Sequence, residues 1–429
     1  MAEITPFQGI RFNQEIVRNM EDVICPPYDI ITPQEQKAYY DRSEYNIIRL
    51  EHGQVNPDDN DTNNKYTRAR DTLTRWLNDR VLKTDNDHTF YIYEQGFKYK
   101  DSFKKRVGLI ACVRLEPWSS KVILPHENTI TGVKSDRLEL MRATNSNISP
   151  ILCLYDDPGY RVTKLITEKM LPGRLLININ NGIESHRIWK ANEPEFTQRV
   201  CHFMLTKTIY IADGHHRYET ALAYRDERAA STAGSRGNEA YNYLIMTLVS
   251  FSDPGIVMLP VHRVVRNIPD SAIEELKQRL PEFFEITRHQ ISESQIAETG
   301  GTDIRVIGLE ENTVWILRLI PSINLADILQ EPHSPVYQRL DISIFEHIIM
   351  EILLTPANKD ENLLYTPDSY SAWSMVKSGQ GKLAFLLNTL PVTTIKSITD
   401  KNDRMPRKST FFYPKLPTGL VLNRLDGIL

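Results

Sequence analysis

One short run, residues 210–222, changes from a strand pattern to a helix pattern within a few positions. Residues 207–212 alternate in polarity and include β-branched side chains, which is typical of a strand that enters a buried sheet. From Tyr218 onward apolar side chains follow helical spacing, so Asp213 and Gly214 form the turn, and Asp213 is a candidate helix cap. The run predicts a strand–turn–helix unit within the mixed sheet of an α/β (α+β) protein.

Basic side chains occupy the first helical turn after this glycine, at His215, His216 and Arg217. A helix N-terminus carries partial positive charge, so a cation there costs roughly 0.3–1 kcal/mol unless an anion compensates it. Backbone N–H groups at a helix start also bind phosphate. We therefore expect an anion site formed by Gly214 and the three basic residues, with Asp213 beside it. The alternative is a capped helix with solvated histidines.

Composition is that of an ordinary soluble globular protein. The 429 residues are 41% hydrophobic and 25% charged, and a chain of this length forms about two to three domains. The formal net charge of −4 gives no reason to expect a basic surface, so we expect no nucleic-acid partner. The longest apolar stretch, residues 243–251, is too short to cross a bilayer, so we expect no membrane contact.

Targeting and redox signals favour a cytoplasmic protein. Residues 1–13 contain no apolar core of signal-peptide length. The four cysteines are widely separated and form no Cys-x-x-Cys pair. This spacing is typical of reduced thiols and argues against a structural zinc site.

Patterns along the chain divide it into three predicted regions. Residues 1–100 form an N-terminal α+β region, residues 101–265 form the core that contains the turn, and residues 266–429 form a C-terminal α+β region. Helices are predicted at residues 65–81, 271–280 and 342–354. Strands are predicted at residues 91–97, 107–115, 243–251, 284–287, 303–309, 313–319 and 382–387.

A second candidate site is the sequence Leu-Pro-His-Glu-Asn-Thr at residues 124–129, which is predicted to form a loop at a sheet edge. A carboxylate beside a histidine can act as a general base, because burial and neighbouring groups tune its basicity. Glu127 and His126 are therefore candidate catalytic residues, together with Asp213. The alternative is a hydrogen-bonded turn without a chemical role.

A basic segment near the C-terminus, residues 404–415, interleaves cations with hydroxyl side chains. Lys408 supplies a point charge, and Ser409 and Thr410 supply donors, which suits phosphate binding. The aromatic residues 411–413 favour a segment packed against the protein over a solvated tail. We expect residues 403–417 to return to the site.

Several separated motifs occur in order along the chain. They are Pro26-Pro27-Tyr28-Asp29, Leu124-Pro125-His126-Glu127-Asn128-Thr129, Ser135-Asp136-Arg137-Leu138, Ser149-Pro150-Ile151, the turn at residues 212–221, and Met405-Pro406-Arg407-Lys408-Ser409-Thr410. Over essentially the full length they resemble a widespread prokaryotic family catalogued as domain of unknown function ten-fifteen. Membership of that family does not by itself imply a reaction.

The turn motif, with residues 125–127 before it and residues 408–410 after it, also resembles archaeal free-serine kinases of the ParB/sulfiredoxin-like superfamily. Those enzymes transfer a phosphoryl group from ADP to the hydroxyl of L-serine. The resemblance implies a ParB/sulfiredoxin-like mixed-sheet core in which Glu127 takes the serine proton. It also implies that residues 213–217 hold the donor phosphates and that residues 408–410 contact phosphate or substrate.

Two features depart from that pattern. More chain separates Glu127 from Asp213 than in those kinases, which implies an insertion at about residues 136–206, and the N-terminal region is a large addition. An insertion beside the base can reshape the acceptor pocket. The residues assigned to the phosphate site can therefore be carried over from the kinases more safely than the residues assigned to the acceptor site.

Phosphoryl transfer depends on positioning and charge stabilisation, with a carboxylate to orient the acceptor. The expected partners are ADP or ATP as the donor and a small hydroxyl compound, such as L-serine, as the acceptor. Mg²⁺ is expected to neutralise donor charge, with Asp213 as its candidate ligand. The usual Gly-x4-Gly-Lys-Ser/Thr loop and the protein-kinase signatures do not occur in the sequence.

Two other functions remain open. One is a nucleotide-binding regulatory module without turnover, against which the carboxylate of Glu127 argues. The other is a metal-dependent hydrolase that uses His126, His215, His216 and Asp213. Adjacent histidines on a helix point about 100° apart, which disfavours their binding one metal.

Overall fold

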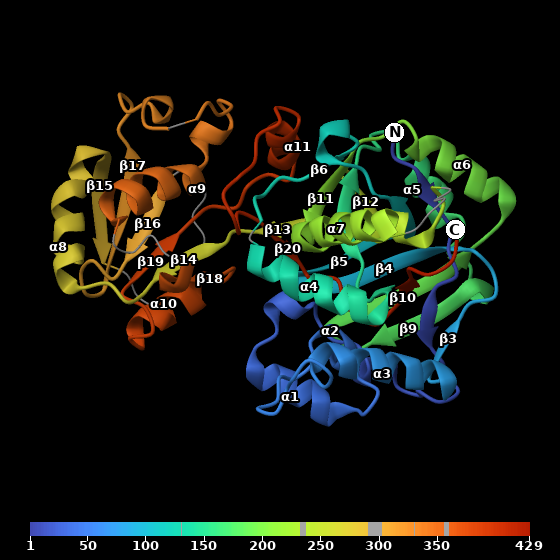
Figure 1. Cartoon of the computed structure of the whole chain (residues 1–429). Helices are drawn as coiled ribbons and strands as arrows, with labels where there is room; N and C mark the ends of the chain where they lie inside the picture. The colour runs from blue at the N-terminus through green and yellow to red at the C-terminus, as the bar shows by residue number, and fades with distance from the viewer. Residues whose placement is uncertain (130, 232–236, 291–302, 330, 356–359) are drawn as a thin grey trace. The chain divides into compact units, whose positions relative to one another are not determined.

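The computed structural model describes residues 1–129, 131–231, 237–290, 303–329, 331–355 and 360–429 (Figure 1). The chain forms two compact units, each described by itself below. Unit 1 comprises Met1–Pro125, Thr129–Ile256 and Pro414–Leu429. Unit 2 comprises His126–Asn128 and Val257–Tyr413.

This division differs from the three predicted regions. The predicted boundary at residue 100 falls in the tight turn between β4 (Phe90–Tyr99) and β5 (Ser102–Arg114). These strands pair continuously from Tyr91↔Ile110 to Tyr99↔Ser102. A hairpin shares one hydrogen-bond ladder, so both of its strands belong to the same unit. The predicted boundary at residue 265 lies near the start of unit 2.

Unit 1 is built on a nine-stranded mixed sheet with the order β6-β11-β8-β12-β5-β4-β10-β9, and β1 also pairs with β5. The pairs β6–β11 and β8–β12 are parallel, and the other pairs of this sheet are antiparallel. The predicted mixed sheet is thus confirmed. The remaining strands of the sheet are β1 (Ile4–Thr5), β6 (Ile123–Leu124), β8 (Ile151–Tyr155), β9 (Leu175–Asn180), β10 (Glu184–Ala191), β11 (Ile209–Asp213) and β12 (Tyr243–Ser250).

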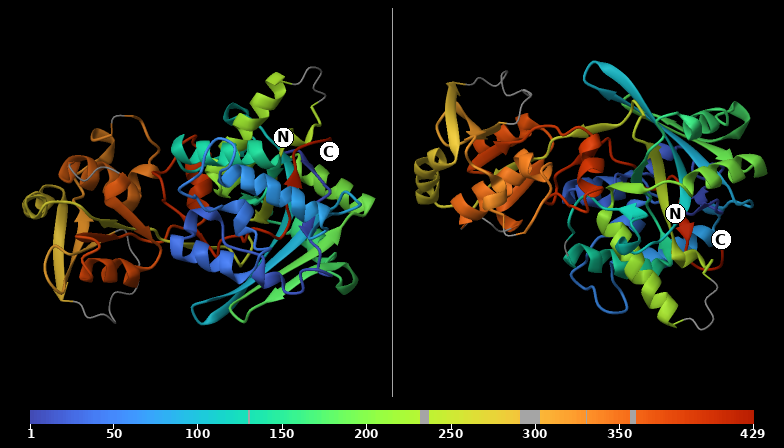
Figure 2. Two further views of the ribbon diagram at one scale, coloured as in Figure 1. Left: turned by 60° about the horizontal axis from the view of Figure 1, so that its bottom comes forward. Right: turned by 90° about the horizontal axis from the view of Figure 1, so that it is seen from above.

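Helices and short ribbons complete unit 1. The long helix α7 lies beside α4 and contributes Tyr218, Ala221 and Tyr224 to the core (Figure 1). Both ends of the chain lie in this unit and close together in each view (Figure 2). The helices are α1 (Pro33–Arg42), α2 (Ile48–Glu51), α3 (Lys65–Asn78), α4 (Thr131–Thr144), α5 (Arg161–Thr167), α6 (Pro194–Met204) and α7 (His215–Ser231). The ribbons pair β2 (Ile10–Phe12) with β3 (Leu82–Thr84), and β7 (Ser146–Asn147) with β21 (Asn423–Arg424).

Unit 2 is built on a six-stranded antiparallel sheet with the order β15-β17-β16-β19-β14-β18. The strands are β14 (His262–Val265), β15 (Phe284–Gln290), β16 (Ile304–Ile307), β17 (Thr313–Leu319), β18 (Leu363–Thr366) and β19 (Leu383–Leu386). A separate ribbon pairs β13 (Val257–Leu259) with β20 (Phe411–Tyr413). The helices are α8 (Asp270–Arg279), α9 (Asp341–Ile344), α10 (Ser369–Lys377) and α11 (Thr393–Thr399). The predicted helix at residues 342–354 is α9 followed by a π-helix, Phe345–Leu353.

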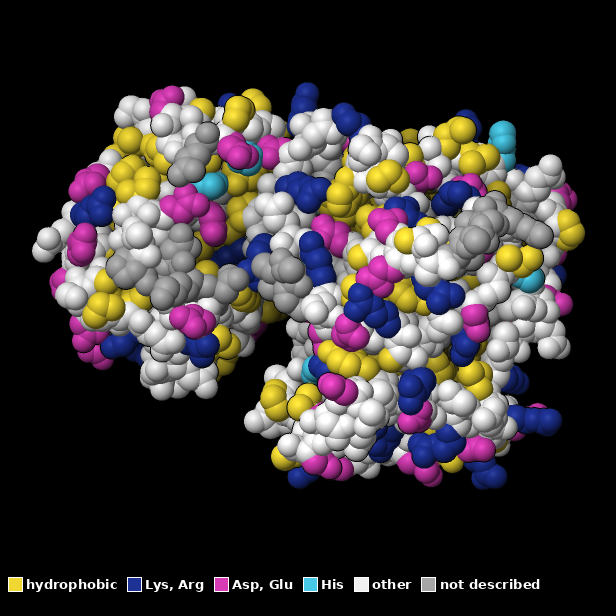
Figure 3. All heavy atoms as spheres, in the orientation of Figure 1, with side chains coloured by type: hydrophobic (Ala, Val, Ile, Leu, Met, Phe, Trp, Pro, Cys, Tyr) yellow, Lys and Arg dark blue, Asp and Glu magenta, His cyan; other side chains and the backbone are white. Residues whose placement is uncertain are grey.

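The surface carries both signs of charge. On the face in Figure 3, lysine and arginine side chains are interspersed with acidic ones over the N-terminal helices. Within the described ranges, no helix is both long enough and apolar enough to cross a bilayer. The four cysteines are free thiols, and Cys25, Cys112 and Cys153 are buried.

Buried histidines make both units sensitive to mild acid. Burial, reinforced by the charges of nearby arginines, lowers the pKa of His186 in β10 and of His262 in β14, each to about 4. The ring of His262 accepts a hydrogen bond at Nδ1 from the Leu387 N–H at 3.1 Å. A proton at Nδ1 would abolish this bond, so the folded protein retains the neutral ring.

We therefore expect the free energy of unfolding to fall as the pH falls from about 6.5 to 4. In this window the unfolded chain binds a proton that the folded protein does not, so each histidine lowers stability by about 1.4 kcal/mol per pH unit. Urea unfolding at several pH values measures the slope. His262→Asn retains an acceptor for Leu387 but does not titrate. The unfolding free energy of this variant should therefore change by about 1.4 kcal/mol less per pH unit than that of the unaltered protein. An unchanged slope would contradict the assignment.

Candidate functional site

The predicted strand–turn–helix unit is present in unit 1. Strand β11 ends at Asp213, Gly214 has a φ of +100°, and α7 begins at His215. A Cβ on Gly214 would lie 2.4 Å from Cγ2 of Ile151. Both the left-handed backbone and this close approach require glycine. The turn therefore places the start of α7 directly against β8.

The carboxylate of Asp213 is held between two cations. Its Oδ1 pairs with Nζ of Lys415, and its Oδ2 accepts a 2.8 Å bond from the guanidinium of Arg217. Burial acts to raise the pKa of Asp213, but the charges of Lys415 and Arg217 outweigh it and hold this pKa well below its usual range. Asp213 therefore does not cap the helix as expected. Its carboxylate pairs with these two cations, and the helix begins two residues later.

Arg217 joins α7 to the Ser-Pro-Ile motif that leads into β8. Its guanidinium donates to Oγ of Ser149 at 3.2 Å and to the carbonyl of Pro150 at 2.7 Å. The cavity that it lines has a volume of about 40 Å³, which suits water and is far smaller than a small-molecule pocket of about 300 Å³ or more. Arg217 therefore holds the turn in place through its bonds to Ser149 and Pro150.

Two further motifs converge on this cluster. The pKa of Lys415 and that of Arg217 would be lowered by burial, but Asp213 and then Asp29 of the Pro-Pro-Tyr-Asp motif raise them. The ring of Tyr28 lies under the guanidinium of Arg137 at 4.1 Å.

A carboxylate links these motifs to the turn. Oε1 of Glu51 accepts the Tyr28 N–H at 3.4 Å and the hydroxyl of Ser149 at 3.3 Å. Motifs far apart in the sequence thus form one polar network around the start of α7.

Sequence reasoning missed Lys415 as a site residue, although it lies within the returning segment. The backbone of this segment is held by a pair of side chains that face each other across β4 and β5. Arg106 donates to the Pro414 carbonyl at 2.9 Å, and Gln95 donates to the Lys415 carbonyl at 3.2 Å. The available signal was a lysine beside aromatic residues and proline, a context that predicts a buried cation in need of a carboxylate.

The two histidines of the motif lie in the first turn of α7. His215 is buried, and its charge contributes to the lowered pKa of Asp213. His216 is half-buried. The structure therefore brings the predicted residues Asp213 to Arg217 together, with Lys415 added.

A second group of predicted residues comes together within unit 2. Glu127 and Met405 form a parallel bridge, which brings the loop at residues 405–410 alongside His126 and Glu127. The carboxylate of Glu127 accepts the Lys408 N–H at 3.1 Å, and the N–H and hydroxyl of Thr410 at 2.9 and 3.0 Å. Nε2 of His126 lies 2.8 Å from the Thr410 hydroxyl. Glu127 thus organises the predicted phosphate-binding loop.

Backbone conformation and hydroxyl contacts give this loop its shape. Lys408 has a φ of +55°, a left-handed conformation that is uncommon outside glycine, and its N–H points to Glu127. Ser409 is buried, and its hydroxyl donates to the Pro406 carbonyl at 2.5 Å. The Ser409 hydroxyl is therefore engaged within the loop.

The described residues offer little to a metal ion. In the part of the chain that the structure describes, no group of three or more His, Cys, Asp or Glu side chains has a metal-binding arrangement. Both oxygens of Asp213, the predicted Mg²⁺ ligand, already contact a cation. Asp213 as observed does not fit a direct Mg²⁺ ligand, because binding would require it to release Lys415 or Arg217.

Comparison with known families decides the membership of this chain. Residues 4–343 match the family described as "Protein of unknown function (DUF1015)". The chain belongs to this family. No curated protein matches this DUF1015 member.

Some solved structures are similar to this DUF1015 member at low identity. One is a free serine kinase variant in complex with ADP, which is 12% identical to this chain. The alignment covers 77% of this chain and 96% of the kinase chain, with a TM-score of 0.39. A conserved hypothetical protein from Pyrococcus furiosus is 13% identical, covers 70% and 92%, and has a TM-score of 0.37. SbnI from Staphylococcus aureus, with a C-terminal truncation, is 12% identical, covers 75% and 87%, and has a TM-score of 0.35.

Proposed function

We propose that this protein is a nucleotide-dependent phosphotransferase that acts on a small hydroxyl compound, with L-serine as the first acceptor to test. The observation that carries the proposal is the β11–α7 turn, where a buried carboxylate and two cations fix the start of a long helix. Strongly shifted pKa values with specific charge partners are concentrated at functional sites. The sequence resemblance described above supplies the reaction class.

In this proposal the donor phosphates bind at the N-terminal end of α7. The helix supplies backbone N–H groups and its dipole, and His215 and His216 supply side-chain donors. Asp213, Arg217 and Lys415 act as positioning residues that hold the turn in place before the nucleotide arrives. Such preorganisation lowers the reorganisation that transfer requires.

By the resemblance to the serine kinases, Glu127 is assigned as the base in the acceptor half of the reaction. Glu127 takes the proton of the acceptor hydroxyl, the acceptor oxygen forms a bond to the terminal phosphorus, and the bond to the nucleotide leaving group breaks. Lys408 and Thr410 contact the transferred group, and His126 orients Thr410. ADP would leave as AMP, and ATP would leave as ADP. No step in this scheme uses Mg²⁺.

A specific observation favours a second candidate, a nucleotide-binding module without turnover. The carboxylate of Glu127 accepts three hydrogen bonds from Lys408 and Thr410, which is also how a purely structural carboxylate behaves. Purified protein incubated with radiolabelled ADP or ATP and a set of small hydroxyl compounds separates the two. Labelled product supports the enzyme, and nucleotide binding without product supports the module.

We expect ADP, ATP or pyrophosphate to raise the melting temperature of the protein. Ligand at about 100 times its dissociation constant stabilises the fold by about 2.7 kcal/mol. His216→Ala should reduce the shift, because His216 lies half-buried in the first turn of α7. Arg217 does not suit this test, since removing its buried guanidinium would destabilise the turn itself.

The matched control is His202→Ala, which removes an exposed histidine from α6 of the same unit. It should leave the nucleotide-induced shift unchanged. If none of the three ligands moves the melting temperature, the phosphate site at α7 is refuted. Equal loss in both variants would refute the role of His216.

A further inference from the structure

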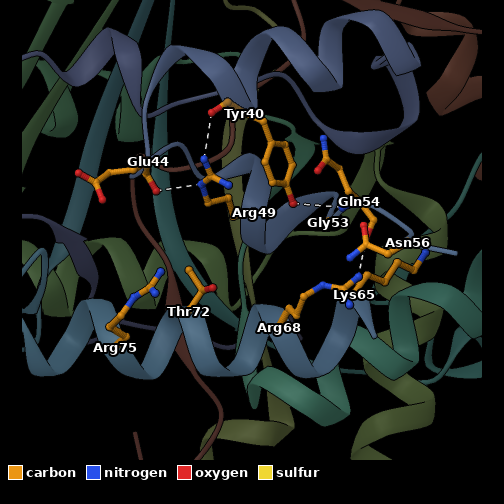
Figure 4. A pocket seen from close by; sticks show the side chains of 10 residues that line it. All are labelled: Tyr40, Glu44, Arg49, Gly53, Gln54, Asn56, Lys65, Arg68, Thr72 and Arg75. Carbon is orange, nitrogen blue, oxygen red and sulfur yellow. Dashed lines mark hydrogen bonds between the residues drawn. The ribbon is translucent and has the colours of Figure 1, made fainter. Parts of the chain in front are cut away.

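A second cavity lies among the N-terminal helices of unit 1 (Figure 4). Its volume is about 400 Å³, which is within the range of roughly 300–1,000 Å³ for small-molecule sites. The walls come from the end of α1, from α2, from the loop at residues 53–56 and from α3. We call it the N-terminal basic pocket and define its charged and hydroxyl lining by Tyr40, Glu44, Arg49, Lys65, Arg68, Thr72 and Arg75.

One face of α3 supplies most of the polar wall. Lys65, Arg68, Thr72 and Arg75 follow the spacing that places side chains on one helical face. Figure 4 shows Thr72 and Arg75 on the side of Arg49, whereas Arg68 and Lys65 extend toward Gln54 and Asn56. The neighbouring face of the helix buries Ala69, Leu73 and Trp76 in the core. Neighbouring like charges destabilise a helix by roughly 0.2–0.5 kcal/mol per pair, so α3 tolerates this cationic face at a cost.

Four cations and one carboxylate, that of Glu44, line the pocket. Lys65 pairs with Asp136, and Arg68 pairs with Asp59. Among the residues that the structure describes, neither Arg49 nor Arg75 has an ion-pair partner. The protein as a whole has a net charge of −4, so this concentration of cations is a local property of the pocket.

Arg49 is already fixed in position. Its Nε donates to the Glu44 carbonyl and its NH2 group to the Tyr40 carbonyl, both at 2.9 Å. Its guanidinium stacks on the ring of Tyr40 at 4.3 Å, and the Tyr40 hydroxyl accepts the Gln54 N–H at 3.1 Å. No acceptor for the remaining NH1 group is present in the described ranges. A ligand therefore meets a preorganised donor, which reduces the entropy lost on binding.

We propose that the N-terminal basic pocket binds a small phosphorylated metabolite. A phosphomonoester carries a charge of about −1.5 to −2 at neutral pH, which matches the two cations that lack ion partners. Arginine forms charge-assisted hydrogen bonds to phosphate oxygens. The Thr72 hydroxyl supplies a further donor, and the remaining volume accommodates a polar group such as a sugar. This site is separate from the turn at α7 and does not depend on the proposed phosphoryl transfer.

Calorimetric titration of the full chain with ribose 5-phosphate, and with ribose as the uncharged comparison, tests the proposal. We expect ribose 5-phosphate to bind with a dissociation constant below about 1 mM, which is about −4.1 kcal/mol, and ribose not to bind. Arg75→Gln should weaken binding by about 10- to 100-fold, since a hydrogen bond to a charged group contributes that much affinity. Arg75 is exposed, so its loss should not unfold the protein.

Arg70→Gln is the matched control, because it removes an exposed arginine of α3 that does not line the pocket. It should bind ribose 5-phosphate within about twofold of the unaltered protein, as expected for an exposed charge. No binding to the unaltered protein, or equal weakening by Arg75→Gln and Arg70→Gln, would overturn the proposal. Weakening by His216→Ala instead of Arg75→Gln would place the phosphate at α7 and also overturn it.

Discussion

Glu127→Gln should lower phosphoryl-transfer turnover by about 10²–10⁴-fold, which is the contribution of a positioned general base. The substitution removes the proton acceptor. It also turns an amide toward the backbone N–H of Lys408 or of Thr410, both of which now donate to the carboxylate. We therefore expect a loss of stability of about 1–3 kcal/mol as well. Turnover and melting temperature must be measured together, well below the unfolding transition.

Asp403→Asn provides the matched control in the same unit. Its carboxylate also accepts a backbone N–H, from Ser334 at 2.8 Å, and contacts His333 at 2.7 Å. The control should lose comparable stability and retain turnover within a fewfold range. If Glu127→Gln retains full activity, the proposed mechanism fails. If both variants lose activity in proportion to stability, Glu127 is structural.

Lys415→Met should destabilise unit 1 by about 3 kcal/mol, because breaking a buried ion pair leaves an uncompensated charge. The Lys415 and Asp213 side chains are only 9% and 16% exposed. Arg217 still contacts Asp213, which places the expected loss at the lower end of the range for buried pairs. Urea unfolding at neutral pH measures the change.

A double-substitution cycle isolates the pair. The Lys415→Met, Asp213→Asn double variant should lose about 0.5–3 kcal/mol less stability than the sum of the two single losses, since the two residues are in direct contact. Arg424→Met removes one partner of the more exposed Arg424–Asp426 pair in the same C-terminal segment, and it should change stability by at most about 1 kcal/mol. Strictly additive effects of the first two substitutions would show that Lys415 and Asp213 are not coupled.

The elements that local sequence predicts best are those with a regular pattern. The strand–turn–helix at β11 and α7, the helix α3 and the strands β4, β5, β12 and β17 lie close to their predicted positions. These segments alternate or repeat strongly, so polarity alone sets which face is buried. The turn glycine was also predictable, because Gly214 follows a strand and precedes a helical pattern.

Contacts between distant segments were harder to predict. Sequence spacing suggests that Arg217 faces a ligand, but the Pro150 carbonyl and Ser149 hydroxyl occupy its donors. These acceptors come from a segment 67 and 68 residues earlier, and local pattern carries no information about such pairing. Lys415 was missed for the same reason. The pairing of Glu127 with the 408–410 loop was partly anticipated, since the motif pointed to a returning segment.

The link between Asp213 and Lys415 has a consequence for the order in which the protein is made. These residues are 202 positions apart, so at about 5–20 residues per second roughly 10–40 s pass between their synthesis on the ribosome. During that time all of Val257–Tyr413 is produced, while Arg106 and Gln95 lack the backbone that they later hold. The first large unit to be encoded is therefore the last to be completed. Until Pro414–Leu429 has been translated, the nascent unit 1 lacks the strand β21 that pairs with β7 and the lysine that pairs with Asp213, and it presents these uncovered groups to chaperones and proteases.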